Sequence, residues 1–304
     1  MVSFMNAEIP VIFIGKYSDE RGVMPYIQGS MDLAKAQGNQ VTLLGKARET
    51  ESAQYPLESF NETAKVFDEV YRHFAYYNET FARLSFRRWF VLKDFMISQK
   101  IERAFVCEND VLLLRNINDV LTNTNKSALC TPEAQNKYDW CSSGHCAYWV
   151  LEDLIQFCDF AIDVYRNKIS RLEEKWNYHQ DQSLPGGVCD MTLFYLFAQE
   201  HKIENLLAVK DGSVFDDNVS TSTNNSENEY KMDYSRIKSI RYQNGGLHAY
   251  NNIREEWIRL NVIHFSGTAK RLIWLFESSF FSKSPNLRNA VVLLLKLGYK
   301  VMQK

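Results

Sequence analysis

The stretch Arg103 to Leu114, RAFVCENDVLLL, places two carboxylates between two apolar runs. The runs on either side have the continuous apolar character of strands that are buried on both faces. Two carboxylates one residue apart, Glu108 and Asp110, repel each other and are costly to desolvate unless a cation lies between them. The stretch therefore predicts a central strand followed by a site for a hard divalent ion, Mg²⁺ or Mn²⁺. The alternative is a solvated turn with two ordinary acids.

The region before this stretch predicts a parallel sheet. The short apolar runs VIFIGK (11–16) and VTLLGK (41–46) each contain a glycine at the end of a strand pattern, and a helix is expected over 23–37 between them. Strand, helix and strand in about 35 residues form a βαβ unit. A helix with a wide apolar face is expected over 79–99, directly before the strand at 104–107. We predict an α/β fold with a Rossmann-type mixed sheet flanked by helices.

The second half has a mixed pattern. A strand is expected over 127–134, followed by helices at VLEDLIQFCDFAIDVYRNKI and CDMTLFYLFAQEH and by late strands at IKSIRY and NVIHFSG. Residues 211–229 carry five acids and no base, which predicts a mobile loop, either a lid or a disordered insertion. The tail 281–304 carries five bases and no acid. It predicts an amphipathic helix that either caps the domain or makes weak peripheral contact with an anionic membrane.

Composition narrows the functional classes. The chain has 304 residues and a net charge of −2, which gives no general attraction to nucleic acid. The N-terminal sequence has neither the basic start nor the apolar run of a secretory leader, and we expect a cytoplasmic protein. The six cysteines form no CxxC pair, which favours reduced, buried thiols.

A second candidate site is VIHFSGTAK, Val262 to Lys270. His264 lies at the end of a short strand pattern, and an imidazole there can complete a metal site. Gly267 allows the backbone to approach a ligand, and Lys270 can neutralise phosphate oxygens. The alternative is a half-buried strand histidine and a surface lysine.

Further candidates are an arginine cluster and an aspartate. Arg83, Arg87 and Arg88 lie on the expected helix 79–99 in a segment without acids, which indicates either a nearby anion or a solvated basic face. Asp190 follows two glycines at the start of an expected helix. It is either a helix N-cap or a general base that projects into a cleft.

Taken in order, these pieces resemble a GT-A fold nucleotide-sugar glycosyltransferase over about residues 11–275. The ExD of Glu108 and Asp110 resembles the DxD metal motif of that family, with Glu in place of the first Asp. FRRWFVLKDF resembles the helix that leads into the motif. CSSGHCAYW and GGVCDMTLF resemble the donor-sugar and acceptor-side loops, and VIHFSGTAK resembles the late diphosphate clamp.

The resemblance implies roles for individual residues. Asp110 would be the main ligand of Mn²⁺ or Mg²⁺, Glu108 would assist through water or the ribose, and His264 would bind the metal or the diphosphate. Lys270 and Gly267 would bind the diphosphate.

The resemblance also implies residues for the rest of the donor. Arg88 would contact the nucleotide, with Arg87 and Arg83 as alternatives. Gly15 and Tyr17 would border the base and ribose. Ser143 and Gly144 would lie in the donor-sugar loop.

The reaction implied is transfer of a sugar from a nucleoside diphosphate donor, by analogy a UDP-sugar, to a hydroxyl of a glycan or glycoconjugate. Asp190 would be the base of an inverting reaction, with Asp181 in reserve. A donor-binding lobe is expected over 1–135, an acceptor-binding lobe over 136–278 and a basic amphipathic helix over 279–304. Two rival interpretations are a nucleotide- or glycan-binding module without turnover and a sugar nucleotidyltransferase. For the latter, GKYSDERG is a poor match to the expected glycine-rich loop.

Overall fold

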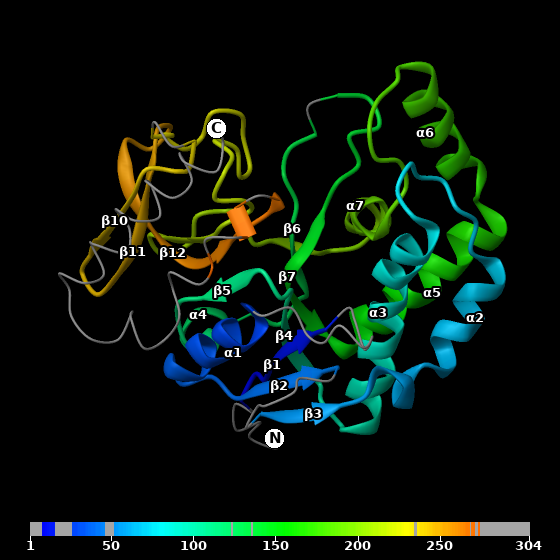
Figure 1. The fold of residues 1–304 in the computed structure, drawn as a ribbon, viewed down its shortest axis with the longest axis horizontal. Coiled ribbons are helices and arrows are strands. Elements are labelled where there is room, and N and C mark those ends of the chain that lie inside the picture. The colour runs from blue at the N-terminus through cyan, green and yellow to red at the C-terminus, as the bar shows by residue number, and fades with distance from the viewer. Residues whose placement is uncertain are drawn as a thin grey trace.

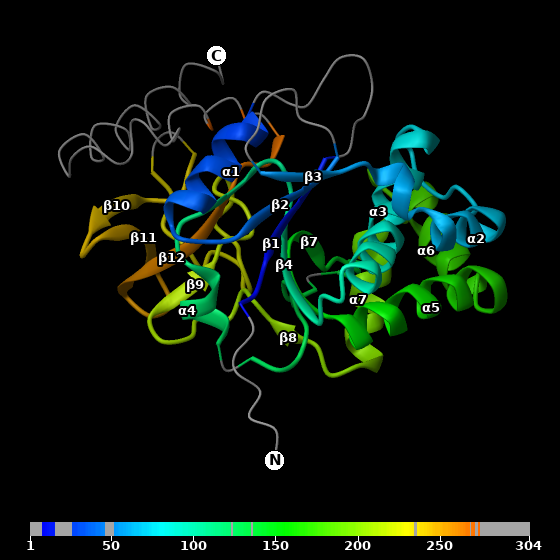
Figure 2. The ribbon, with the colours of Figure 1, turned by 90° about the horizontal axis from the view of Figure 1, so that it is seen from below.

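The larger of two sheets has seven strands and runs through the middle of the molecule (Figures 1 and 2). The structure, a computed structural model, describes residues 8–15, 26–45, 52–122, 124–134, 136–233, 236–267, 269–270 and 273. In spatial order the strands are β3 (Ala53–Tyr55), β2 (Val41–Leu44), β1 (Val11–Ile14), β4 (Arg103–Cys107), β7 (Ser143–Val150), β6 (Ala128–Cys130) and β8 (Glu204–Asn205). Strand β7 is antiparallel to both of its neighbours, and the other pairs are parallel. The predicted α/β class with a mixed sheet flanked by helices is confirmed.

Helices cover both faces of this sheet. On one face lie α2 (Glu62–Val70), α3 (Glu79–Ser98), α5 (Leu151–Asn167), α6 (Ser170–Asp181) and α7 (Asp190–Glu200). On the other lie α1 (Tyr26–Ala36) and α4 (Ile117–Leu121), together with the smaller sheet. A 3₁₀ turn, η1, spans Leu57–Phe60. Because strands of a sheet alternate their side chains between two faces, each face has its own core. Val106 packs toward α3 and α5, whereas Phe105 packs toward α1.

The smaller sheet contains β10 (Ile240–Gln243), β11 (Gly246–Asn251), β12 (Glu256–His264) and β5 (Val111–Leu113), with β9 (Ser213–Phe215) paired to β12. Its strand β5 follows β4 after only three residues, Glu108 to Asp110. The interrupted stretch of the sequence is therefore the passage of the chain from one sheet to the other.

Two predictions about the second half were wrong. CSSGHCAYW does not form a loop, because most of it is the central strand β7, which is buried along most of its length. The acidic segment 211–229 is not a mobile loop either. It contains β9, and Asp216 is fully buried in an ion pair with Lys238, so this acid lies in the interior.

The other predicted helices and strands in the described residues agree in kind, with shifted ends. Elements without a prediction are α2, α4, α6, β3, β8 and β11. Strands from both expected lobes, 1–135 and 136–278, lie in the larger sheet. The tail 281–304 lies outside the described residues. No helix in the described part of the chain has the length and apolar character required to cross a membrane.

Candidate functional site

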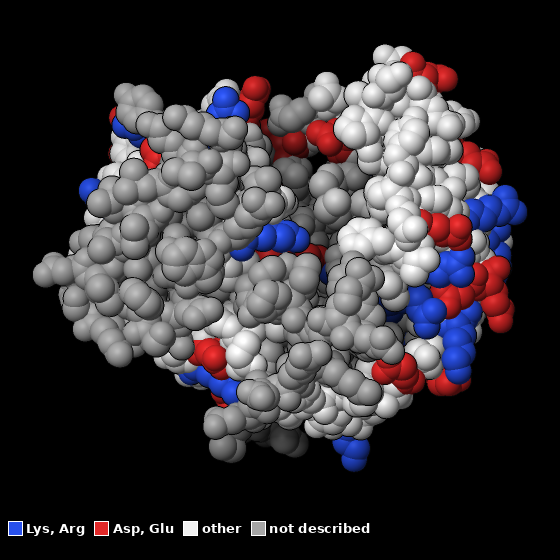
Figure 3. All heavy atoms as spheres, viewed as in Figure 1, with Lys and Arg blue, Asp and Glu red and all other residues white. Residues whose placement is uncertain are grey.

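A cavity of about 520 Å³ opens beside the carboxyl end of β4. It lies between the part of the molecule that carries the smaller sheet and the helical part, where Figure 3 shows the surface hollowed. Predicted site residues that line the cavity are Arg88, Glu108, Asp110, Ser143, Gly144, Asp190, His264 and Lys270. Segments that are far apart in the sequence therefore meet at one site, in the place where ligands bind to open α/β sheets.

Asp110 is the centre of the polar end of the cavity. It is 3% exposed, and its Oδ2 lies 2.7 Å from Lys270 Nζ and 3.8 Å from His264 Nε2. The antiparallel pairing of β5 with β12 sets Val111 opposite His264, which brings the histidine to the neighbouring aspartate. Asp110 Oδ1 is buried and makes no hydrogen bond to any described residue. A buried carboxylate oxygen without a partner is costly and fits a cation ligand.

His264 presents a lone pair toward this aspartate. Its Nδ1 donates a hydrogen bond to the carbonyl oxygen of Asp217, so Nε2 carries no proton in the neutral ring. The ring stacks on His145 with centroids 4.1 Å apart. His145 Nε2 donates to the carbonyl of Asp216 (2.9 Å), and its Nδ1 accepts from the hydroxyl of Ser143 (2.7 Å). Burial lowers the pKa of His145 well below its usual value, and the neighbouring His264 lowers it further.

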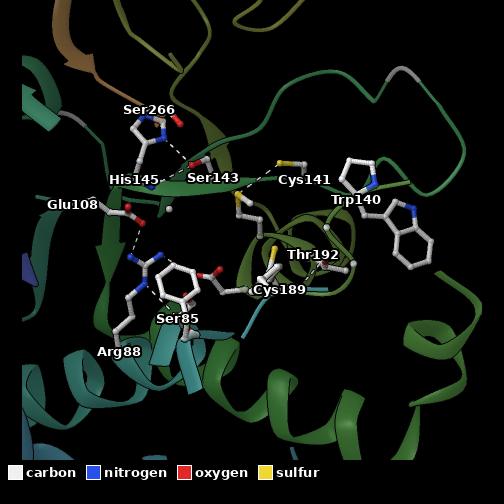
Figure 4. A pocket seen from close by; sticks show the side chains of 18 of the residues that line it. Ser85, Arg88, Glu108, Trp140, Cys141, Ser143, His145, Cys189, Thr192 and Ser266 are labelled. Carbon is white, nitrogen blue, oxygen red and sulfur yellow. Dashed lines mark hydrogen bonds and ion pairs between the residues drawn. The ribbon is translucent and has the colours of Figure 1, made fainter. Parts of the chain in front are cut away.

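Glu108 pairs with Arg88 through its Oε1. Arg88 donates to Glu108 Oε1 at 2.5 Å and to Asp190 Oδ2 at 2.7 Å, and its Nε donates to the carbonyl of Ser85 (Figure 4). Burial lowers the pKa of Arg88, but the two carboxylates raise it above its ordinary value. Of the three predicted metal ligands, Asp110 and His264 approach each other to 3.8 Å.

Asp190 begins α7 and lines the cavity, where it shares the guanidinium of Arg88 with Glu108. Its Oδ2 also accepts from Trp89 Nε1 at 3.0 Å, whereas Oδ1 has no hydrogen-bond partner in the described part of the chain. Cys189, and not Asp190, is the N-cap of this helix. The position of Trp89 depends on Gly144, because a Cβ there would lie 2.6 Å from the indole.

The structure does not bring every predicted residue to the cavity. Arg87 pairs with Asp68 on α2, and Arg83 pairs with Glu79 within α3. Gly15, Gly267 and Asp181 do not line the cavity, and Tyr17 lies outside the described residues.

Three contributors to the site were not foreseen. His145 was not predicted as a site residue, although its place next to Gly144 in CSSGHCAYW was a usable signal. The carbonyl groups of Asp216 and Asp217 orient the two stacked histidines. The sequence of an acidic segment does not indicate that its backbone carbonyl groups accept hydrogen bonds from two histidines of the site.

Ligating side chains gather in one further place in the described part of the chain. Cys130, His145 and Cys146 are buried beside the cavity, with ligand atoms within 4.8 Å of one another. Because His145 Nε2 donates to a carbonyl, it has no lone pair to offer there. Burial raises the pKa of both thiols, so they fit the expected reduced, buried cysteines better than a second metal site.

No protein-family model and no curated protein sequence matches the chain. Among solved structures, it is similar to mouse xyloside xylosyltransferase 1, at 9% identity and a TM-score of 0.43, over 66% of this chain and 84% of that one. It is also similar to a glycosyltransferase involved in the glycosylation of the major capsid of PBCV-1, at 14% identity and a TM-score of 0.30, over 54% of this chain and 78% of that one.

A third similar structure is the glycosyltransferase GlyE of Streptococcus pneumoniae TIGR4, at 16% identity and a TM-score of 0.33, over 67% of this chain and 46% of that one. All three are structures of glycosyltransferases by name. Similarity at these levels does not assign the chain to a family, and the functional argument rests on the site itself.

Proposed function

We propose that the chain is a GT-A-type glycosyltransferase that moves a sugar from a nucleoside diphosphate donor, by analogy a UDP-sugar, to a saccharide hydroxyl. The observation that carries the proposal is the meeting of Asp110, His264 and Lys270 at the carboxyl end of a central strand. A carboxylate with an unpartnered buried oxygen, an imidazole lone pair and an ammonium group suit a divalent cation beside a diphosphate.

The chemistry follows from these charges. Mn²⁺ or Mg²⁺ held by Asp110 and His264 would supply electrostatic stabilisation of the departing diphosphate. Lys270 Nζ binds phosphate oxygens in the same place and offsets their negative charge. Glu108 would assist at the cation, with its Oε1 held 2.5 Å from Arg88. Arg88 is a positioning residue, because its N–H groups hold Glu108 and Asp190.

Asp190 is our candidate for the base of an inverting reaction. Arg88 and Trp89 fix Oδ2, which leaves Oδ1 to take a proton from the acceptor hydroxyl. The acceptor would then approach from α7, opposite the cation site. His264 and Lys270, which belong to the expected acceptor lobe 136–278, would then serve the donor.

The cation assignment is tested with Asp110→Asn, which keeps the side-chain shape and removes the charge. We expect UDP with Mn²⁺ to raise the melting temperature of the wild type and to leave that of Asp110→Asn nearly unchanged. Ligand at about 100 times its Kd stabilises a folded protein by about 2.7 kcal/mol, which thermal-shift measurements detect easily.

Asp119→Asn is the matched control, because Asp119 is an exposed carboxylate on α4 away from the cavity. It should respond to UDP and Mn²⁺ as the wild type does. An equal response from Asp110→Asn would refute the cation assignment, and no response from the wild type would refute the nucleotide site.

The base assignment is tested with Asp190→Asn. We expect unchanged UDP binding and a loss of transfer of about 10²- to 10⁴-fold, the usual contribution of a general base. Turnover near the wild-type level, or retention of the anomeric configuration in the NMR spectrum of the product, would show that Asp190 is not the base. Slow donor hydrolysis by the wild type distinguishes an enzyme from a binding module.

A further inference from the structure

His264 is held by three hydrogen bonds to the short segment that follows β9. Its ring Nδ1 donates to the carbonyl oxygen of Asp217, and its backbone N–H donates to Asp216 Oδ2 at 3.4 Å. Its carbonyl oxygen accepts from the N–H of Val219 at 3.0 Å. The bond from Nδ1 determines which ring nitrogen keeps a lone pair for Asp110 or a cation. The candidate metal ligand therefore depends on where residues 216–219 place their carbonyl groups.

Asn224 fixes two successive peptide groups of this segment. Its side-chain Nδ2 donates to the carbonyl oxygen of Phe215 at 3.1 Å, and its Oδ1 accepts from the N–H of Asp217 at 3.0 Å. Because a peptide group is planar, the bond to the N–H of Asp217 also fixes the carbonyl of Asp216, which belongs to the same peptide group. That carbonyl accepts from His145 Nε2, so Asn224 sets the position of the hydrogen-bond acceptor of His145.

Lys238 connects Asn224 to the carboxylate of Asp216. Its ammonium group donates to Asp216 Oδ1 and, at 2.5 Å, to Asn224 Oδ1, and it lies 4.6 Å from the centre of the Tyr230 ring. Its backbone N–H donates to the carbonyl oxygen of Val219 at 2.8 Å. Asp216, Asn224 and Lys238 are each 0% exposed, and we call these three residues the buried triad.

The buried triad makes its hydrogen bonds on both sides of the carbonyl group that takes the proton of His264. On one side it holds the peptide group between Asp216 and Asp217, and on the other it holds Val219. A buried ion pair is weak evidence for stability, because apolar side chains of similar volume often replace such a pair without loss. Partners that accept from a metal-binding histidine, in contrast, fix its tautomer and the orientation of its ring.

We propose that Lys238, together with Asp216 and Asn224, is a positioning residue of the cation site. The buried triad fixes the carbonyl groups of Asp216 and Asp217, and these keep the proton of His264 on Nδ1 and the lone pair of its Nε2 toward the cation. The inference rests on the proposed function for the presence of a cation. The state of the histidine ring is measured without one.

The first test is ¹H–¹⁵N NMR of the histidine rings of the full chain, free of metal and at about pH 8, above the ordinary pKa of a histidine. The signals of His264 are those that His264→Gln removes. We expect a protonated Nδ1 in the wild type. In the double variant Asp216→Asn, Lys238→Met, which removes both charges together, we expect a mixture of the two tautomers. Asn224→Ala keeps the ion pair, should change the ring in the same direction, and decides the matter if the double variant does not fold.

The second test is the affinity for Mn²⁺, measured as the Mn²⁺ concentration that gives half of the maximal thermal shift with saturating UDP. Loss of a partner that orients a metal-binding histidine typically weakens metal binding about 10- to 100-fold, and we expect both variants to raise the Mn²⁺ concentration by a factor in this range. Ile240→Val is the matched control, because Ile240 is buried in the apolar core of the same sheet and is not part of the triad. It should leave the Mn²⁺ concentration unchanged.

A proton on Nε2 of His264 in the wild type would overturn the inference. A ring that neither variant alters, or an Mn²⁺ concentration that neither variant raises, would reduce the buried triad to a structural ion pair. An equal effect of Ile240→Val would show that any loosening of the smaller sheet weakens the site, which also overturns the inference. Absence of a thermal shift in the wild type is a separate failure: it removes the proposed function, while the ring signals still decide whether the triad sets the tautomer.

Discussion

The guanidinium of Arg88 joins two carboxylates that belong to different parts of the cavity. Glu108 lies at the end of β4 and Asp190 at the start of α7. Arg88 and Asp190 are 7% and 4% exposed, so neither charge has water as an alternative partner. Arg88 thereby sets the separation between the cation site and the candidate base.

Arg88→Met should destabilise the protein strongly, because it leaves two carboxylates without their cation. Breaking a buried pair by removing one partner costs about 3–5 kcal/mol, measurable by urea unfolding. Arg87→Met is the control, since Arg87 and Asp68 form a partly exposed pair, for which a loss of about 0–1 kcal/mol is typical. Equal losses in the two variants would contradict the role given to Arg88.

Strand β7 shows how one element supplies several parts of the site. It carries Ser143, Gly144 and His145 past the cavity and is antiparallel to β4. Gly144 admits Trp89 against the strand, and Trp89 in turn donates to Asp190. A small residue in a strand thus determines the position of an aspartate on a helix.

Gly144→Ala should therefore destabilise the fold by about 1–3 kcal/mol, the usual range for overpacking. The new Cβ would lie 2.6 Å from Trp89 and 2.8 Å from Phe194. Gly15→Ala is the matched control, because a Cβ there has no neighbour closer than 3.6 Å. Chemical denaturation of both variants provides the comparison, and an unchanged midpoint for Gly144→Ala would show that the strand can shift to accept the methyl group.

The same elements show what sequence patterns can predict. The helix over 79–99 was predictable because its apolar residues recur with helical spacing. The strands that end in glycine were predictable because each is a continuous apolar run. Strand β7 was not, because its Ser143, Gly144 and His145 resemble loop residues. They are tolerated in a buried strand because each has a specific partner: a histidine ring, an indole and a carbonyl group.

At the scale of the molecule, the order of the motifs predicted that distant segments would meet, and the cavity brings Asp110, Asp190, His264 and Lys270 together. The pairing inside the site was not predictable. His264 reaches Asp110 through the register of β12 on β5, and the partner of Glu108 is an arginine that had been assigned to the nucleotide. Long-range register and charge pairing depend on the packed chain and not on local periodicity.

The three residues between β4 and β5 join the larger sheet to the smaller one. Asp110 lies at that junction, and His264 and Lys270 belong to the smaller sheet and to the segment after it. A ligand held by all three would link the two sheets to each other. A substitution that favours the ligand-bound arrangement of the two sheets would therefore tighten ligand binding, even from the far edge of the smaller sheet, because it raises the fraction of the chain that is ready to bind.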